Sequence, residues 1–173
     1  MRNLSPTELK RLHRDWRRRT EGRLALLLDA VQTPYNVGAI LRTAAAMRVE
    51  RLWLVGPTES PTHPKTQKTA LGSQRFLTWD TCPDPDTAAD AVAAAGFALV
   101  GVELAEGARP LHELDLPADV CLALGHEDRG LSKACLARCD QVGFIPQLGP
   151  VASLNVATAA AIAMYEVRRR AWT

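Results

Sequence analysis

Long apolar runs are missing from this chain of 173 residues, and no stretch approaches the roughly 20 apolar residues of a membrane-spanning helix. The charged first residues, MRNLSPTELKRLHRDWRRR, also lack the apolar segment of a secretory signal. Both absences argue against a membrane protein and against an exported one. We therefore expect a cytoplasmic protein with no membrane partner.

Cysteine and histidine are scarce, with four residues of each. The cysteines form no C-x-x-C pair and have no clustered histidines near them. Cys135 and Cys139 lie four residues apart on an expected helix and could face one way, but packing explains this spacing better than zinc does. We expect reduced thiols, as in the cytoplasm, and no metal.

The common phosphate-binding loops are absent too. No G-x-G-x-x-G follows the first expected strand, and G-x-x-x-x-G-K-[ST] occurs nowhere. The segment GHEDRG is rich in glycine, but it places Glu127 where a carboxylate would repel phosphate. These absences exclude the usual nucleotide-phosphate sites.

Charge is present but unevenly distributed. Residues 1–23 carry eight Arg and Lys against three Asp and Glu, and Arg168, Arg169 and Arg170 add three positive charges near the other end. Residues 24–167 hold ten basic and sixteen acidic residues, a net charge of −6. Basic ends around an acidic body favour an anionic partner, with nucleic acid as the first candidate.

Residues 4–19 have the pattern of a helix. Ser5 and Glu8 form a capping box, and Pro6 suits the first turn. The spacing places two groups of side chains on separate faces, an apolar group and a basic group: Leu9, Leu12 and Trp16; Arg11, Arg14 and Arg18. We therefore expect a basic helical extension over residues 1–22 and a single larger domain over residues 23–173.

Apolar runs and helical patterns alternate through that domain. We expect strands at 24–31, 51–56, 76–79, 97–104, 119–125 and 141–146. We expect helices at 36–47, 86–96 and 132–139, a buried helix from Leu154 onward, and a loop with a short helix at 57–75. This alternation predicts an α/β fold with a parallel, doubly wound sheet covered on both faces.

Three expected loops combine Gly or Pro with polar residues at strand ends. They are QTPYNVGAILR, GHEDRG and QLGPVASLN. Ligands of open parallel sheets bind outside the carboxyl ends of the strands, so these are candidate binding loops.

Each polar residue of these loops has a structural and a functional interpretation. Asn36, Ser153 and Asn155 could cap helices or face a site. Glu127 could be stabilised at a helix N-terminus, or could meet a donor, a cation or a neutral ligand. Arg42 could be a surface arginine with a buried stem, or a clamp for phosphate. The residues alone leave these alternatives open.

Taken together, three ordered segments resemble the motifs of the SpoU/TrmH family. They are NVGAILR at 36–42, GHEDRGLS at 125–132 and IPQLGPVASLNVA at 145–157, and KTALGSQRFL at 68–77 resembles the segment between the first two motifs. Members of this family are S-adenosylmethionine-dependent RNA ribose 2′-O-methyltransferases of the SPOUT superfamily. The resemblance spans about residues 22–167.

The resemblance implies a C-terminal deep trefoil knot, a homodimer and no metal. The knot loops around Leu124–Gly130 and Ile145–Leu154 would hold S-adenosylmethionine, and S-adenosylhomocysteine would be the product. Matched motif by motif, the implied catalytic residues are Arg42, Asn36, Glu127, Ser153 and Asn155. The implied cofactor-binding residues are Gly101, Val102, Glu103, Leu124, Gly125, Gly130, Ile145, Gln147, Ser153, Leu154 and Asn155.

The resemblance also assigns roles. Arg42 matches the catalytic arginine, and we favour a phosphate clamp beside the target ribose over a base, because a guanidinium resists deprotonation. Glu127, Asn36 and Asn155 would orient Arg42, the cofactor and the knot loops, whereas His126 would be incidental. Gln147 departs from the family, since many relatives have an apolar residue there, often Met.

The implied partner is RNA, with tRNA favoured over rRNA. Few residues precede the first strand, so the separate N-terminal RNA-binding domain of many rRNA enzymes is not expected. A short basic helix resembles the extensions of tRNA enzymes, and Arg11, Arg14, Arg18 and Arg42 would contact the RNA. The alternatives are an rRNA enzyme of antibiotic-resistance type, a non-catalytic RNA-binding knot protein, and an N-terminal helix that only closes the fold.

Overall fold

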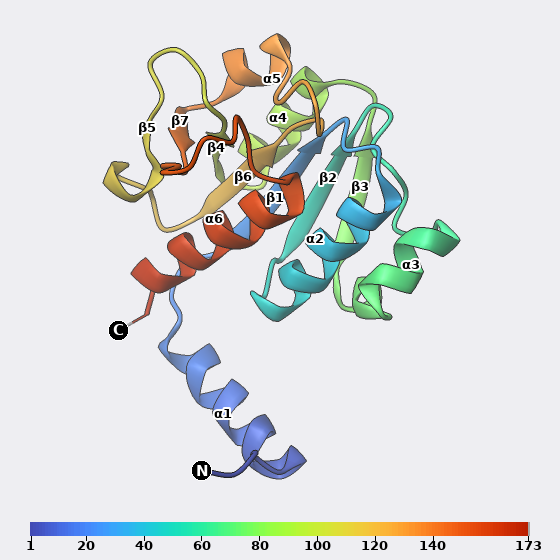
Figure 1. Cartoon of the computed structure of the whole chain (residues 1–173), viewed down its shortest axis with the longest axis vertical. Helices are drawn as coiled ribbons and strands as arrows, with labels where there is room; N and C mark the ends of the chain where they lie inside the picture. The colour runs from blue at the N-terminus through green and yellow to red at the C-terminus, as the bar shows by residue number, and fades with distance from the viewer. Residues whose placement is uncertain (173) are drawn as a thin grey trace.

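A single parallel sheet of seven strands forms the centre of the computed structural model, which describes residues 1–172 (Figure 1). The strand order is β3-β2-β1-β6-β4-β7-β5. The strands are β1 (Leu24–Asp29), β2 (Arg51–Val55), β3 (Thr78–Cys82), β4 (Ala98–Val102), β5 (Arg109–Pro110), β6 (Val120–Leu124) and β7 (Gln141–Phe144). The prediction of a parallel α/β sheet is confirmed.

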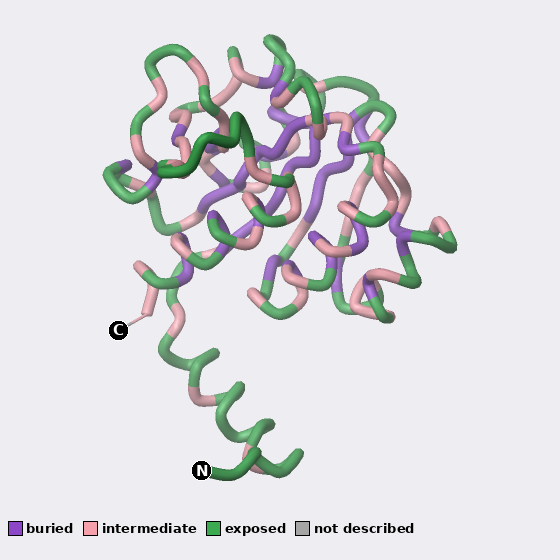
Figure 2. Tube along the Cα trace, in the orientation of Figure 1, coloured by how far each residue is buried: buried purple, intermediate pink, exposed green. Residues whose placement is uncertain are grey.

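Helices cover both faces of the sheet. The larger core packs α2 (Pro34–Ala46), α3 (Pro64–Ala70) and α6 (Val156–Arg170) on one face, and the smaller core packs α4 (Pro85–Ala94) and α5 (Lys133–Arg138) on the other. The central strands are buried along their length, which explains why they are apolar at successive positions (Figure 2). Two 3-10 turns, η1 (Ser73–Phe76) and η2 (Leu111–Glu113), complete the described elements.

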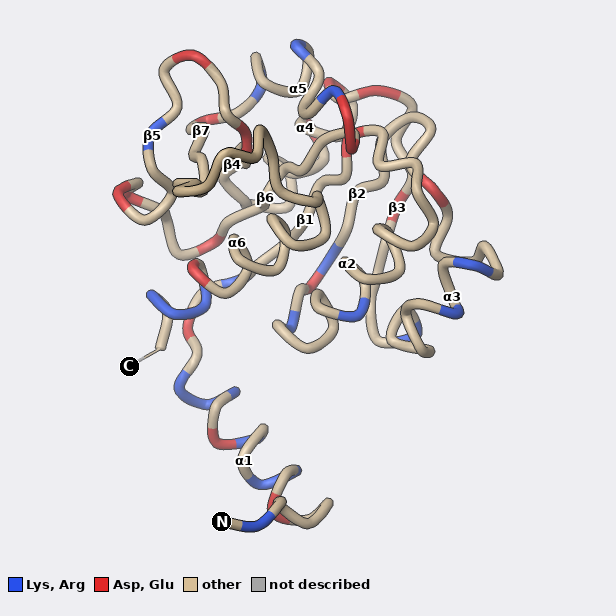
Figure 3. Tube along the Cα trace, in the orientation of Figure 1, with Lys and Arg blue, Asp and Glu red and all other residues tan. Residues whose placement is uncertain are grey.

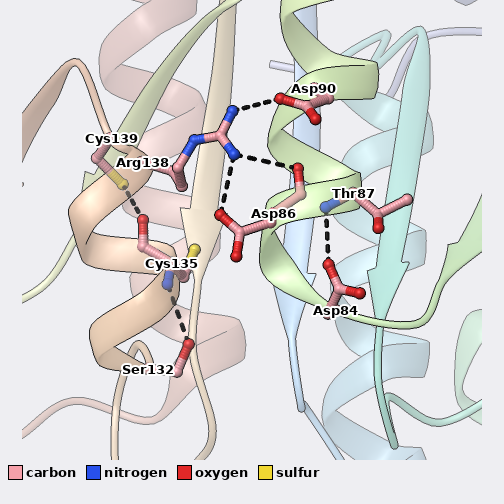
Figure 4. A network of polar contacts seen from close by, with 8 residues as sticks. All are labelled: Asp84, Asp86, Thr87, Asp90, Ser132, Cys135, Arg138 and Cys139. Carbon is pink, nitrogen blue, oxygen red and sulfur yellow. Dashed lines mark hydrogen bonds and ion pairs between the residues drawn. The ribbon is translucent and has the colours of Figure 1, made fainter.

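Polar contacts cap the start of α5 and tie its end to α4 (Figure 4). Ser132 caps α5 through the backbone N–H of Cys135, and Arg138 pairs with Asp86 and Asp90 on α4. The Cys139 thiol donates to the Cys135 carbonyl oxygen. These two cysteines face each other within the helix turn, and the described residues contain no group of three or more His, Cys, Asp or Glu able to hold a metal.

Several predicted boundaries were wrong by a few residues. The helix expected at 36–47 begins at Pro34 with Thr33 as its N-cap, so Asn36 lies inside the first turn and does not cap α2. The strand expected at 76–79 begins at Thr78, because the backbone still turns in η1 before it extends. The two-residue strand β5 is too short to leave a periodic pattern.

The N-terminal helix α1 (Pro6–Arg19) projects away from the body (Figure 1). Its capping box between Ser5 and Glu8 forms as predicted. However, none of its described residues is buried, and Trp16 remains 43% exposed although it packs on Trp172 with ring centroids 5.2 Å apart. The helix therefore does not close the fold over the core, because its apolar face touches the body only at this end.

The three C-terminal arginines are used within the fold. Arg168 is 4% exposed and donates to the backbone carbonyls of Gly22, Met47 and Arg48. Arg169 and Arg170 both pair with Glu166. Arg168 is therefore withdrawn from any partner and the other two charges share one carboxylate, whereas basic residues also recur along α1 (Figure 3).

Helix α6 is only partly buried in a single chain. Ala160, Ala163 and Met164 lie in the core, but Tyr165 is 49% exposed and Ile162 is exposed as well. The expectation of a helix buried nearly all round is therefore wrong for one copy of the chain.

Among the described residues, no helix combines the length and the apolar character that crossing a membrane requires.

Candidate active site

A cavity of about 420 Å³ opens at the carboxyl ends of β4, β6 and β7. Three connections form its walls: the end of β4, the loop after β6 and the segment between β7 and α6. Its size is within the range of small-molecule sites, and its position is where open parallel sheets bind ligands. Many residues singled out from the sequence line it: Val102, Glu103, Leu124, Gly125, Glu127, Gly130, Ile145, Gln147, Ser153 and Leu154.

Other lining residues were not named as site residues from the sequence, and one of them, His126, was judged incidental. They are Leu104, His126, Asp128, Arg129, Phe144, Val156 and Ala159. Four of them lie within the motif segments themselves: His126, Asp128, Arg129 and Val156. Leu104 and Phe144 adjoin the predicted residues Glu103 and Ile145, so the motifs and their flanks were the available signal. Ala159 is the exception, because it reaches the cavity only through the first turn of α6.

Glu127 is held at the N-terminus of α2. Its carboxylate accepts from the backbone N–H of Thr33 at 2.8 Å and of Gln32 at 3.3 Å, and from Asn36 Nδ2 at 3.0 Å. Burial opposes the charge, but the hydrogen bonds from Asn36 and Thr33 outweigh it and lower the pKa of Glu127 to about 2. The carboxylate is thus stabilised at a helix N-terminus, although the helix is α2 rather than the one that follows it in sequence.

Asn36 and Asn155 continue this polar chain. Asn155 Nδ2 donates to Asn36 Oδ1 at 2.9 Å, and Asn155 Oδ1 accepts from the backbone N–H of Ala157 and Thr158 at the start of α6. Asn155 is therefore both a helix cap and a link to Asn36, so its two interpretations are compatible. The hydrogen-bonded chain of side chains Glu127–Asn36–Asn155 joins the loop after β6, helix α2 and helix α6 beside the cavity.

The loop after β6 is closed tightly beneath the cavity. A side chain on Gly125 would collide with the backbone of Gly130 and Leu131, and Gly130 has a φ of +67°, which favours glycine. Glu103 supports the loop from β4, because Oε2 accepts from the backbone N–H of Leu131 at 2.8 Å. His126 Nδ1 accepts from the backbone N–H of Asp128 at 3.0 Å, which gives His126 a structural use in this loop.

Gln147 provides an observation about what the cavity could hold. The residue lines the cavity, and its Oε1 atom is buried and has no hydrogen-bond partner among the described residues. A buried acceptor without a partner costs free energy, so a ligand N–H or O–H at this point would satisfy it. The carboxylate of Glu103, at the end of β4, also lines the cavity and suits a ligand that carries positive charge.

Gly101 and Arg42 lie away from the cavity. Gly101 is within β4, where a side chain would meet the Cys139 sulfur and the Leu131 side chain. Arg42 is exposed on α2, six residues beyond Asn36, which corresponds to about 9 Å along the helix axis and to a different face. Arg42 lines a second groove, between α1 and the body. One copy of the chain therefore does not bring Arg42 together with Asn36, Glu127, Ser153 and Asn155.

Known proteins resemble this chain over most of its length. The chain is 35% identical to an uncharacterized tRNA/rRNA methyltransferase of Synechocystis over 87% of its length, and it covers 54% of that protein. It is 34% identical to the tRNA (guanosine(18)-2′-O)-methyltransferase of Thermus thermophilus, covering 98% of this chain and 86% of that protein. The chain thus spans little more than half of the first relative and most of the second.

A solved structure agrees in fold as well as in sequence. The SpoU methyltransferase AviRb of Streptomyces viridochromogenes, in complex with the cofactor AdoMet, superposes with a TM-score of 0.78 at 32% identity over 87% of this chain and 58% of that one. The pattern of the SpoU rRNA Methylase family matches residues 23–165. The chain therefore belongs to the SpoU rRNA Methylase family.

Proposed function

We propose that this protein is an S-adenosylmethionine-dependent RNA methyltransferase that modifies a ribose 2′-hydroxyl. The single observation that carries the proposal is the chain Glu127–Asn36–Asn155 beside the cavity of about 420 Å³. It ties together the three segments that matched the family motifs, although they are distant in sequence. The relatives named as RNA methyltransferases, and the one named in complex with AdoMet, support the same activity.

The residues around the cavity fit S-adenosylmethionine. When bound, the cofactor would supply a methyl group attached to a positively charged sulfur, and that sulfur is a good leaving group. The negative charge of Glu103 would stabilise that cation, and Gln147 Oε1 would accept a hydrogen bond from the cofactor. Leu124, Ile145 and Leu154 provide apolar walls, and Ser153 stands at the exposed mouth.

The protein's task in the reaction is to orient the ribose hydroxyl and assist loss of its proton. Arg42 would hold the phosphate beside the target ribose with its planar guanidinium and stabilise charge on the oxygen. The chain Glu127–Asn36–Asn155 would fix the cavity loops, since a small misplacement of reacting atoms is costly in rate. Gly101 would contribute only by its close packing within β4, behind the cavity.

A homodimer would resolve the position of Arg42. Within one chain Arg42 points into a groove away from the cavity, so the site is incomplete without a second copy. The exposed side chains Leu148, Val151, Ile162 and Tyr165 offer apolar area for that contact. We further propose that the C-terminal segment is threaded as a deep trefoil knot and that the protein works in the cytoplasm.

The proposed substrate is tRNA. The relative from Thermus thermophilus is named for guanosine 18 of tRNA. Its alignment covers 98% of this chain, so the aligned region includes the basic N-terminal extension. The relative from Synechocystis is named for tRNA and rRNA together, so rRNA is the second candidate.

The test is methyl transfer from labelled S-adenosylmethionine to total tRNA and, separately, to rRNA, followed by mass spectrometry of the nucleosides. We expect a 2′-O-methylnucleoside in tRNA. Arg42→Ala should lower the rate by about 100-fold or more while cofactor affinity changes little. Arg42→Lys should fail similarly, since a point charge cannot make the planar two-pronged contact. Near-normal turnover of Arg42→Lys would contradict the role assigned to Arg42.

A further inference from the structure

A second groove lies between α1 and the body of the protein. Its volume is about 730 Å³, and α1, α2, η1 and the end of α6 contribute to its walls. Among the residues that line it are four basic and two aromatic ones: Lys10, Arg17, Arg42, Arg48, Trp16 and Phe76. None of the described residues in the lining is acidic.

The positive charge of the groove is available to a ligand. Lys10, Arg17, Arg42 and Arg48 make no side-chain hydrogen bond or ion pair with the residues that the structure describes. Other arginines of the body are neutralised, for example Arg23 by Asp119 and Glu50. Four uncompensated cations in one groove create a positive potential that suits a polyanion.

Aromatic side chains accompany this charge. Phe76, at the end of η1, is 70% exposed, and the guanidinium of Arg75 lies over its ring, 4.8 Å from the centroid. Trp16 and Trp172 pack together on the opposite wall. Basic residues beside an exposed aromatic ring match the requirements of single-stranded nucleic acid, because phosphates meet the cations and an unpaired base stacks on the ring.

The groove also distinguishes the two basic faces of α1. Lys10, His13 and Arg17 occur at intervals of three and four residues, so they share the face that lines the groove. Arg11, Arg14 and Arg18 are about 100° further around the helix and lie outside the groove lining. The sequence had suggested only the second face as an RNA contact.

We propose that this groove binds the single-stranded RNA segment that flanks the target ribose, with phosphates on Lys10, Arg17 and Arg48 and an unpaired base on Phe76. The inference rests on the proposed function, because Arg42 is the residue at which the groove would deliver the RNA to the reaction. A folded RNA would thus have to present an unpaired loop. The contact is separate from the cofactor cavity.

The test measures RNA binding without the cofactor, using a fluorescein-labelled single strand of about ten nucleotides and a duplex of the same sequence. The variant Lys10→Gln/Arg17→Gln should make the log–log salt dependence for the single strand shallower by about 1.4, from two lost phosphate contacts. Phe76→Ala should weaken single-strand binding at least about fivefold, and Phe76→Trp should retain it. These three side chains are exposed, so the substitutions leave the core intact.

The matched control is Arg109→Gln/Lys133→Gln, which removes the same charge from exposed positions outside the groove lining. It should bind the short strand like the parent. Equal losses in both double variants, unchanged binding in the groove variants, or equal affinity for the duplex would each overturn the proposal. So would dissociation of a dimer in Phe76→Ala, which would assign the groove to a subunit contact. Failure of the proposed function would look different: the strand would bind in the groove, yet no RNA would be methylated.

Discussion

Asn155 combines two contacts that a sequence pattern treats as alternatives. Its side-chain oxygen caps α6, and its side-chain nitrogen reaches Asn36 on α2. An amide is one of the few groups that can do both at once, because it offers an acceptor and a donor on the same short side chain. Residue identity is therefore constrained more tightly at this position than capping alone requires.

Two substitutions at Asn155 separate these contacts. Asn155→Asp keeps the acceptor for the N–H groups of α6 but loses the donor to Asn36, and it adds negative charge near Glu127. We expect it to retain the stability of α6 yet weaken S-adenosylmethionine binding or turnover, whereas Asn155→Ala should also lose about 1 kcal/mol of stability. Calorimetric affinity, turnover and urea unfolding measure the three effects. Unchanged affinity and turnover in both variants would remove Asn155 from the site.

The ionisation of Glu127 makes the folding stability of the protein depend on pH. Its pKa is lowered from 4.5 to about 2 in the folded protein, so its contribution is full above about pH 4.5 and is lost as the pH falls toward 2. Glu127→Gln should be less stable than the parent at neutral pH, and the difference should shrink over that acidic range. Urea unfolding of both proteins across the pH range measures it. A difference that is constant with pH would show that the charge of Glu127 contributes nothing.

At the scale of elements, α1 behaves differently from the helices of the body. Its capping box makes it a helix locally, but its tertiary support comes from Trp16 on Trp172, which also packs on Tyr165 of α6. A backbone bridge between Thr20 and Trp172 holds the same junction. A helix attached at one end leaves the basic residues along its length accessible to a large partner (Figure 3).

The outer face of α1 gives a prediction for a complete tRNA rather than a short strand. Replacing Arg11, Arg14 and Arg18 with Gln should weaken tRNA binding and make its salt dependence shallower by about 0.9 per lost phosphate contact on duplex regions. S-adenosylmethionine affinity should not change, because the cavity is built from the body. Salt titrations with a tRNA transcript measure the slope. A variant with the parent's affinity and slope would leave the outer face without a role in RNA binding.

At the scale of the whole molecule, Arg42 and the cavity occupy separate places in each chain. If a dimer combines them, two inactive variants should complement each other. A purified hybrid of one Arg42→Ala chain and one Asn155→Ala chain would hold one complete site, so we expect about half of the parent's activity. Differently tagged, co-expressed chains provide the hybrid, and each variant alone provides the control. An inactive hybrid would show that Arg42 serves the cavity of its own chain.

The sequence by itself determined the parallel sheet, the capped N-terminal helix and the membership of the family. These follow from local patterns: apolar runs at strand positions, Ser5 three residues before Glu8, and three ordered motifs. The family motifs also located most of the cavity wall. Such features are readable because each depends on residues close together in the chain.

Only the tertiary structure decided which polar residues meet. Glu127 contacts Asn36 across 91 positions, and Asn155 contacts the same Asn36 across 119. The structure likewise buried Arg168 among carbonyls and placed Arg42 in a groove with α1 instead of beside the cavity. A charge or an amide carries no periodic signal for its partner, since the partner is set by strand order and helix packing. The direction in which Arg42 points is therefore a property of the fold, whereas its presence on α2 is a property of the sequence.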